Sequence, residues 1–267
     1  MEFVRATDVA DAIAAKADDP DAEFLAGGTD LMVEVNLAAH RPSSVIGLRR
    51  IDEIREVTPS RIGAGVTWDR LEQVSHSALA QAARAVGSPQ IRAAGTIGGN
   101  IGTASPAGDA LPWIAALDAS IEVASRGRGR RVIPWDEFFV GVKQTSLAAD
   151  EMITAVVLPA EVPPVQEFAK VGVRNAMVIS TVSCVVARTT GGFRVALGSV
   201  APTPMRALEA EKMINAETAP SAAAVAEFGR IVASEVRPIT DHRSTEAYRR
   251  HAAGVLARRL LERCLAA

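Results

Sequence analysis

The sequence has few of the residues on which metal, disulfide and nucleophilic chemistry depend. It contains only two cysteines, Cys184 and Cys264, which lie far apart and form no Cys-x-x-Cys pair. This argues against a disulfide framework, a zinc site or an iron–sulfur cluster carried by this chain alone. There is no Gly-x-Ser-x-Gly elbow and no cysteine–histidine pairing, and no metal-ligand spacing among the four histidines, His40, His76, His242 and His251. We therefore expect no metal in this chain and no catalytic side chain.

The net charge and the aromatic content are also low. The formal net charge of −2 gives no support for nucleic acid as a partner, and an aromatic content of 4% makes a base-stacking platform improbable. The most apolar run, residues 176–187, is interrupted by hydroxyl side chains and is too short to span a bilayer. The first residues lack the basic and then apolar pattern of a signal peptide. We expect a cytoplasmic protein with no membrane span and no nucleic-acid partner.

What the chain does have is glycine in two concentrated stretches. Residues 87–109 are rich in glycine, proline and small hydroxyl residues, and residues 25–31 (Leu-Ala-Gly-Gly-Thr-Asp-Leu) are of the same character. Such stretches bring the backbone close to a ligand and turn N–H groups toward it, since glycine tolerates positive φ. For either stretch alone, the alternative to a binding site is a glycine-rich surface loop that binds no ligand. Two of them favour a binding site for a phosphate-bearing cofactor.

The upstream stretch reads as a strand, a pair of glycines and a helix. Residues 23–26 are typical of a short strand, and Thr29 is a candidate N-cap for the helix that follows. This arrangement places free N–H groups and a positive helix end at one spot, which suits a pyrophosphate. A tight turn between strand and helix is the structural alternative. Gly63-Ala64-Gly65 lacks the third glycine of a Rossmann fingerprint, so that match is weak.

The rest of the chain indicates an α+β protein of two domains. Pro163 and Pro164 mark a boundary, because consecutive prolines stop regular structure. Strands are expected at residues 165–173, 178–188 and 193–200, with a hairpin turn at 189–192, and helices dominate from residue 205 onward. The last helix is expected to begin after Ser244 and to bury an apolar face of Tyr248, Ala252, Val255, Leu256 and Leu260. Its arginines, among them Arg249, are interpreted as solvated or inter-subunit charges.

A phosphate-binding cradle without an evident acid, base or nucleophile predicts that a cofactor performs the chemistry. Flavin fits this description, because its ring carries redox function without a catalytic side chain.

The motifs of this chain resemble those of a known family, the FAD-binding subunits of the molybdenum hydroxylases. That family includes the medium subunit of aerobic carbon monoxide dehydrogenase and the flavin domain of xanthine dehydrogenase. The resemblance covers nearly the whole chain. It rests on residues 26–31 (AGGTDL), 88–92 (SPQIR), 95–100 (GTIGGN) and 104–109 (ASPAGD), with residues 196–207 and 241–244 matching the family's C-terminal domain.

The resemblance implies a fold. A two-lobed FAD-binding domain of the vanillyl-alcohol-oxidase (PCMH) type would occupy residues 1–160, with lobes of about 1–56 and 57–160. A small domain of the carbon monoxide dehydrogenase flavoprotein type would follow over residues 165–267, with a three-stranded antiparallel sheet and a helical bundle. FAD would lie extended between the lobes. No histidine or cysteine stands in either glycine motif, so the FAD is expected to be noncovalent.

The resemblance also implies roles for particular residues. The backbone of residues 25–32 and 96–100 would wrap the FAD diphosphate, and Asp109 would bind ribityl or ribose hydroxyls. Lys170 matches a family lysine near the flavin, Met152 or Ile153 would pack on the adenine side, and Val86 stands where some relatives place an aromatic residue. The candidate cofactor-binding residues are Leu25, Ala26, Gly27, Gly28, Thr29, Asp30, Leu31, Val86, Gly95, Thr96, Ile97, Gly98, Gly99, Asn100, Ser105, Gly108, Asp109, Ile153 and Lys170.

In such enzymes a large molybdopterin-binding subunit oxidises the substrate and a small subunit carries two [2Fe–2S] clusters. The flavin then passes electrons to a final acceptor, which would be NAD, quinone or oxygen. The resemblance thus implies both partner subunits, in a heterotrimer or its dimer. Two alternatives remain open: a stand-alone FAD-dependent oxidase or dehydrogenase, and a structural subunit that binds no flavin.

Overall fold

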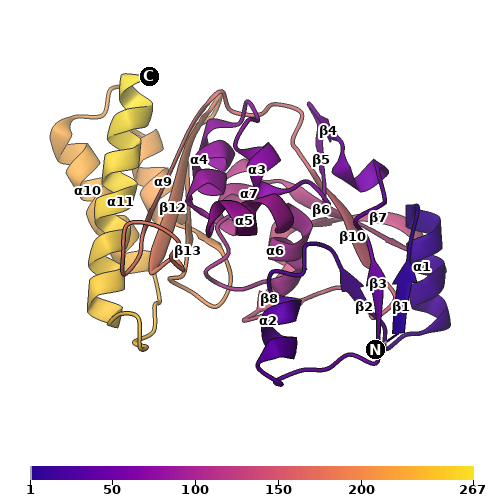
Figure 1. The fold of residues 1–267 in the computed structure, drawn as a ribbon. Helices are drawn as coiled ribbons and strands as arrows, with labels where there is room; N and C mark the ends of the chain where they lie inside the picture. The colour runs from indigo at the N-terminus through magenta and orange to yellow at the C-terminus, as the bar shows by residue number, and fades with distance from the viewer. Residues whose placement is uncertain (1) are drawn as a thin grey trace.

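Three larger sheets and one short hairpin account for the strands among the residues that the structure describes, 2–267 (Figure 1). The structure is a computed structural model. Within residues 2–267 no helix is both long and apolar enough to cross a membrane. The mixed α+β architecture agrees with the expected fold class.

The first sheet is parallel and small. Its strand order is β1 (Glu2–Arg5), β3 (Ser44–Gly47) and β2 (Glu23–Leu25). Helix α1 (Val9–Asp18) connects β1 to β2, and its N-cap is Asp8, whose carboxylate accepts the Asp11 N–H at 2.7 Å. Helix α2 (Leu31–Asn36) follows β2. Ile46 of this sheet shares one buried cluster with Met152 of the next sheet, so the two sheets pack as one body.

The second sheet is antiparallel, with the order β4-β5-β10-β6-β7. The largest fully buried side chains of its core are Trp113 and Phe138. The strands are β4 (Val57–Thr58), β5 (Arg61–Gly63), β6 (Ser120–Ser125), β7 (Gly129–Pro134) and β10 (Met152–Val157). The elements between them are a 3-10 turn (Glu53–Arg55), α3 (Trp68–Leu71), α4 (Ser77–Ala85), α5 (Pro89–Ala94), α6 (Ile97–Thr103), α7 (Leu111–Leu117), α8 (Trp135–Phe138) and the hairpin β8 (Phe139–Gly141) and β9 (Gln144–Thr145).

The third sheet lies between two layers of helices (Figure 1). It comprises β11 (Val165–Val171), β12 (Val182–Thr189), β13 (Gly192–Gly198) and β14 (Met205–Arg206). Successive side chains of β12 alternate between cores: Val185 packs in the cluster of the second sheet, and Val186 in the cluster of the C-terminal helices. Because both faces are buried, residues 184–187 of the strand are apolar at consecutive positions. The covering helices are α4 and α7 on one face, and α9 (Leu208–Asn215) and α11 (Glu246–Ala266) on the other, with α10 (Ala222–Glu235) packed against α9 and α11.

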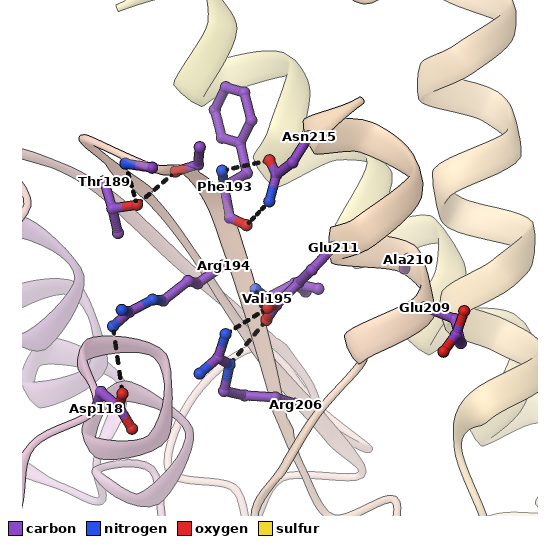
Figure 2. Close-up of polar contacts among 12 residues, drawn as sticks. Asp118, Thr189, Phe193, Arg194, Val195, Arg206, Glu209, Ala210, Glu211 and Asn215 are labelled. Carbon is purple, nitrogen blue, oxygen red and sulfur yellow. Dashed lines mark hydrogen bonds and ion pairs between the residues drawn. The ribbon is translucent and has the colours of Figure 1, made fainter. Parts of the chain in front are cut away.

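The fourth strand, β14, is a correction to the three strands expected from the sequence. Figure 2 shows how it is held: the Glu211 carboxylate of α9 accepts Arg206 Nε at 2.9 Å and the Val195 N–H of β13 at 2.9 Å. A strand of two residues forms few backbone hydrogen bonds of its own. The charge-assisted bonds of the buried Glu211 carboxylate therefore help to hold β14 beside β13. Strand β12 also begins at Val182 and not at residue 178.

The last helix differs from expectation at three places. Its N-cap is Thr245, whose hydroxyl accepts the Tyr248 N–H at 3.2 Å, while the N–H of Ser244 donates to Asp241. Tyr248 is 49% exposed and so lies off the buried face. Arg249, interpreted from the sequence as solvated or inter-subunit, is only 4% exposed.

The Arg249 guanidinium is buried because three acceptors surround it. Nη1 donates to the carbonyls of Thr181 at 2.6 Å and Ser199 at 3.0 Å, and Nη2 donates to the Asp241 carboxylate at 2.8 Å. Burial would raise the pKa of Asp241, but the bond from Arg249 and the N–H groups of Arg243 and Ser244 outweigh it and lower this pKa to about 2.

This pKa predicts how Asp241 affects stability in acid. A depressed pKa means that the stabilisation is present above the ordinary value of 3.8 and is lost as the pH falls through about 2. The difference in unfolding free energy between wild type and Asp241→Asn should therefore be full near neutral pH and shrink over that acid range. Urea unfolding at several pH values measures it. Asp18→Asn, at a surface pair with Arg126, is the control and should show no such difference; a constant Asp241 difference down to the lowest pH would contradict the prediction.

Candidate functional site

Both glycine stretches line one cavity of about 550 Å³, here called the main cavity. It lies where β2 and α2 of the first sheet approach α6 and β10 of the second (Figure 1). Residues 25–31 are called the first glycine loop and residues 87–109 the second. The structure therefore brings together two stretches that the sequence holds more than fifty positions apart.

The first glycine loop offers unpaired backbone donors. Gly28 has φ +70°, a conformation that glycine adopts without strain. Within residues 2–267 the N–H groups from Gly27 to Leu31 donate to no protein acceptor. Helix α2 begins at Leu31 with Asp30 before it, so Thr29 is not the N-cap that its position suggested. Consecutive free N–H groups beside a cavity form an anion-binding concavity.

The two loops touch each other directly. A Cβ built on Gly27 would lie 1.9 Å from the Ala94 carbonyl oxygen, which is closer than any real contact. Thr103 Oγ1 donates to the Asp30 carboxylate at 3.0 Å and joins the end of α6 to the first loop. Gly27 is therefore required by close approach of the backbones.

The second glycine loop uses its N–H groups differently. The Ile97 and Gly98 N–H groups donate to the carbonyls of Val66 at 3.0 Å and Ala64 at 2.8 Å. Thr96 caps the helix, and its Oγ1 accepts the Gly99 N–H at 3.0 Å. These bonds fix α6 on the second sheet. The first loop thus presents five consecutive free N–H groups, and helix α6 of the second loop contributes a rigid wall.

Fifteen of the nineteen residues predicted from the sequence line the main cavity. They are Leu25, Ala26, Gly27, Gly28, Thr29, Asp30, Leu31, Val86, Thr96, Gly98, Gly99, Asn100, Ser105, Gly108 and Ile153. The other four, Gly95, Ile97, Asp109 and Lys170, do not line it. Gly95 packs beneath Thr29 and Trp68, and Ile97 is fully buried in the core of the second sheet.

Asp109 and Lys170 instead form a buried ion pair. Lys170 Nζ lies 2.6 Å from Asp109 Oδ2, and the two side chains are 9% and 7% exposed, respectively. Ser180 Oγ donates to Asp109 Oδ1 at 2.6 Å. Burial raises the pKa of Asp109, while the charge and hydrogen bond of Lys170 and the bond from Ser180 act to lower it. Lys170 lines a second cavity, of about 810 Å³, together with Arg84, Arg92 and Arg174.

Several lining residues carried no signal in the sequence. Trp68 and Leu48 come from separate elements that reach the main cavity only through folding, and Ile179 comes from the loop before β12. Thr103 lies inside the second glycine loop, so its hydroxyl could have been included from its position. The others could not have been found without knowing which segments meet.

Glu151 also lines the main cavity, but its carboxylate is held by the protein itself. Arg131 donates to it through Nε at 2.7 Å and Nη2 at 2.8 Å, and the Ala148 N–H donates at 2.9 Å. These bonds, that of Arg131 first, lower the pKa of Glu151 against the effect of burial. Glu151 is therefore a fixed anion in the wall and is poorly suited to proton transfer.

Within residues 2–267 the lining of the main cavity includes no histidine, cysteine or tyrosine. No group of three or more histidine, cysteine, aspartate or glutamate side chains in that range could hold a metal ion. The cavity thus offers backbone donors, hydroxyls, an amide, apolar surface and four acidic residues, Glu23, Asp30, Glu34 and Glu151. A lining of convergent polar groups and apolar surface binds and orients a large polar ligand.

Comparison with known proteins identifies two families along the chain. Residues 1–161 match the family described as the FAD binding domain in molybdopterin dehydrogenase. Residues 167–264 match the CO dehydrogenase flavoprotein C-terminal domain.

Individual relatives match over almost their full length. The chain is 32% identical to the putative xanthine dehydrogenase FAD-binding subunit XdhB of Escherichia coli strain K12, over 99% of this chain and 96% of the relative. It is 28% identical to the carbon monoxide dehydrogenase medium chain of Afipia carboxidovorans, over 100% and 97%. A solved structure of carbon monoxide dehydrogenase from Hydrogenophaga pseudoflava, which lacks the Mo-pyranopterin moiety, superposes with a TM-score of 0.90 at 29% identity, over 100% and 97% of the two chains.

Proposed function

Because this chain belongs to the FAD-binding subunits of the molybdenum hydroxylase family, we propose that it holds noncovalent FAD in the main cavity. It would pass electrons from the iron–sulfur clusters of a partner subunit to a final acceptor. The observation that carries the cavity assignment is the set of free N–H groups from Gly27 to Leu31. Each charge-assisted hydrogen bond from such a group to phosphate contributes about 1.5–3 kcal/mol.

The residues present fit this cofactor. The backbone from Gly27 to Leu31 would hold the diphosphate, and the hydroxyl of Ser105 and the amide of Asn100 are polar groups in the same wall. Asn100 is itself oriented, because its Oδ1 accepts the Ala110 N–H at 3.2 Å. When bound, FAD supplies the electron-carrying chemistry that no lining side chain can supply. We assign cofactor binding to residues 1–160, in lobes of about 1–56 and 57–160, and place the second domain at 165–267.

The partners follow from the same proposal. The relatives are named as medium chains or subunits of dehydrogenases, which supports a molybdopterin-binding large subunit and a [2Fe–2S] small subunit as partners. A heterotrimer or its dimer is the expected assembly. NAD, quinone and oxygen are the candidate final acceptors.

An absorption spectrum of the purified chain tests the cofactor assignment. We expect flavin bands, and release of intact FAD on denaturation, identified by mass. A colourless protein that takes up no added FAD would contradict it and leave a structural subunit. Rapid turnover of small substrates by the isolated chain, without partner subunits, would instead indicate a stand-alone oxidase or dehydrogenase.

A further inference from the structure

We propose that the second cavity binds the diphosphate group of a nucleotide through Arg84 and Arg174. The cavity has a volume of about 810 Å³, which lies in the range of pockets that hold small organic ligands. The proposal goes beyond the assignment of FAD to the main cavity and does not depend on it, because neither arginine lines the main cavity.

The lining of the second cavity is positively charged. Its cationic residues are Arg84, Arg92, Lys170 and Arg174, and within residues 2–267 the lining includes no aspartate or glutamate. The charge of Arg92 is compensated by a pair with Glu72. The charge of Lys170 is compensated by Asp109. Among residues 2–267 no carboxylate forms an ion pair with the other two arginines, so their charges are available to an anion.

Arg174 is fixed in the wall of the second cavity by its own loop. Its Nε donates to the carbonyls of Ala176 at 3.0 Å and Met177 at 3.1 Å, and its Nη2 also donates to Met177. Met177 has φ +50°, a left-handed conformation that is uncommon for residues other than glycine. Carbonyl acceptors orient a guanidinium but do not neutralise it. The loop therefore holds a positive charge in place, and none of these bonds uses Nη1.

Arg84 reaches the second cavity from the last turn of α4. The helix dipole favours a positive charge at this position, which is the structural alternative for Arg84 alone. It does not account for Arg174, which belongs to a loop and lines the same cavity. Two guanidinium groups in one cavity match a diphosphate, because each can donate two parallel hydrogen bonds to a phosphate group.

Apolar surface supplies a place for the rest of the nucleotide. Phe168, Val171 and Val178 line the second cavity, as do Pro89 and Met177. Met177 is 52% exposed, and a methionine side chain adapts its shape and makes favourable contacts with aromatic rings. An apolar wall beside two cations suits a ligand that combines a flat base with a negatively charged group. A nucleotide has both, whereas inorganic pyrophosphate has only the charge.

The second cavity lies directly beside the main cavity. The residue pairs 86–87, 91–92 and 178–179 each contribute one residue to either cavity. A nucleotide in the second cavity would therefore be separated from bound FAD by a single layer of backbone. Two classes of nucleotide carry the required diphosphate: a nicotinamide dinucleotide, which can exchange electrons with FAD, and an adenine nucleotide, which cannot.

Isothermal titration of the FAD-loaded chain tests the proposal, because FAD then occupies the main cavity. We expect ADP and NADH to bind with an affinity that falls as salt is added, and inorganic pyrophosphate to bind more weakly. Arg84→Gln and Arg174→Gln should each weaken ADP binding by about 10- to 100-fold, since a charge-assisted bond to phosphate is lost. Arg259→Gln, which removes one exposed charge from α11, is the matched control and should bind ADP as wild type does.

Trypsin cleavage after Arg174 gives a second readout. Residues 173–177 are exposed, so bound ADP should slow cleavage in the wild-type chain, and the same ADP concentration should give no protection in Arg84→Gln. The two classes of nucleotide are separated by adding NADH without oxygen. Bleaching of the flavin absorption bands would identify a nicotinamide dinucleotide as the ligand, whereas binding without bleaching would identify an adenine nucleotide.

The proposal would be overturned if neither ADP nor NADH bound, or if ADP bound equally well to the double variant Arg84→Gln/Arg174→Gln. Pyrophosphate binding as tight as that of ADP would also overturn it, because the apolar wall would then contribute nothing. Loss of FAD from the arginine variants would mean that the second cavity belongs to the cofactor site. If the wild-type chain bound no FAD, the proposed function would fail, and the effect of both arginine variants on ADP binding would still decide the second site.

Discussion

Gly27→Ala is expected to weaken FAD binding by about 10- to 100-fold, because relieving an overpacked contact costs about 1–3 kcal/mol. The added Cβ would lie 1.9 Å from the Ala94 carbonyl oxygen and 2.9 Å from Gly95 Cα. These are backbone atoms, so they cannot turn away as a flexible side chain would. The first glycine loop must move from the second, and the N–H groups from Gly27 to Leu31 then lose their common direction.

Isothermal titration of the FAD-free protein with FAD measures this change. Gly127→Ala is the matched control, since a Cβ at Gly127 meets nothing within 4 Å and its φ is not positive. It should bind FAD as wild type does. Wild-type affinity in Gly27→Ala would mean that the contact between the loops does not shape the cofactor site.

Arg249→Ala is expected to lower the unfolding free energy by about 3–5 kcal/mol, the cost of removing one partner from a buried ion pair. The change leaves the carbonyls of Thr181 and Ser199 and the carboxylate of Asp241 without their donor. A buried acceptor without a partner costs free energy because water cannot replace the lost bond.

Urea unfolding followed by circular dichroism measures the stability. Arg258→Ala lies on the same helix, where Arg258 is exposed and 3.9 Å from Glu262, and should cost no more than about 1 kcal/mol. Arg249→Lys keeps the charge and should recover part of the loss. A change in Arg249→Ala as small as that of Arg258→Ala would show that the buried bonds are replaced by water.

The burial of Arg249 could be predicted in part from the sequence. The last helix buries Ala252, Ala253, Leu256 and Leu260, and Arg249 lies three and seven residues before the first and third of these, on the same face. Arg249 was nevertheless interpreted as solvated or inter-subunit, because its side chain is charged. The three acceptors that make burial possible come from two loops and a strand end, and no local sequence pattern predicts that they meet Arg249.

The family, the α+β class and fifteen of the residues that line the main cavity could be predicted from the sequence, because they depend on local motifs and residue patterns. Glycine clusters and the consecutive prolines Pro163 and Pro164 act over a few positions, so they can be recognised directly in the sequence. Which N–H groups stay free depends on the tertiary structure. Ile97 and Gly98 are satisfied by Val66 and Ala64, whereas Gly27 to Leu31 meet no carbonyl, and this difference depends on which distant backbone lies opposite. The same reason applies to the buried pair of Asp109 and Lys170: a charged side chain pairs with the partner that folding brings to it, and sequence position does not specify that partner.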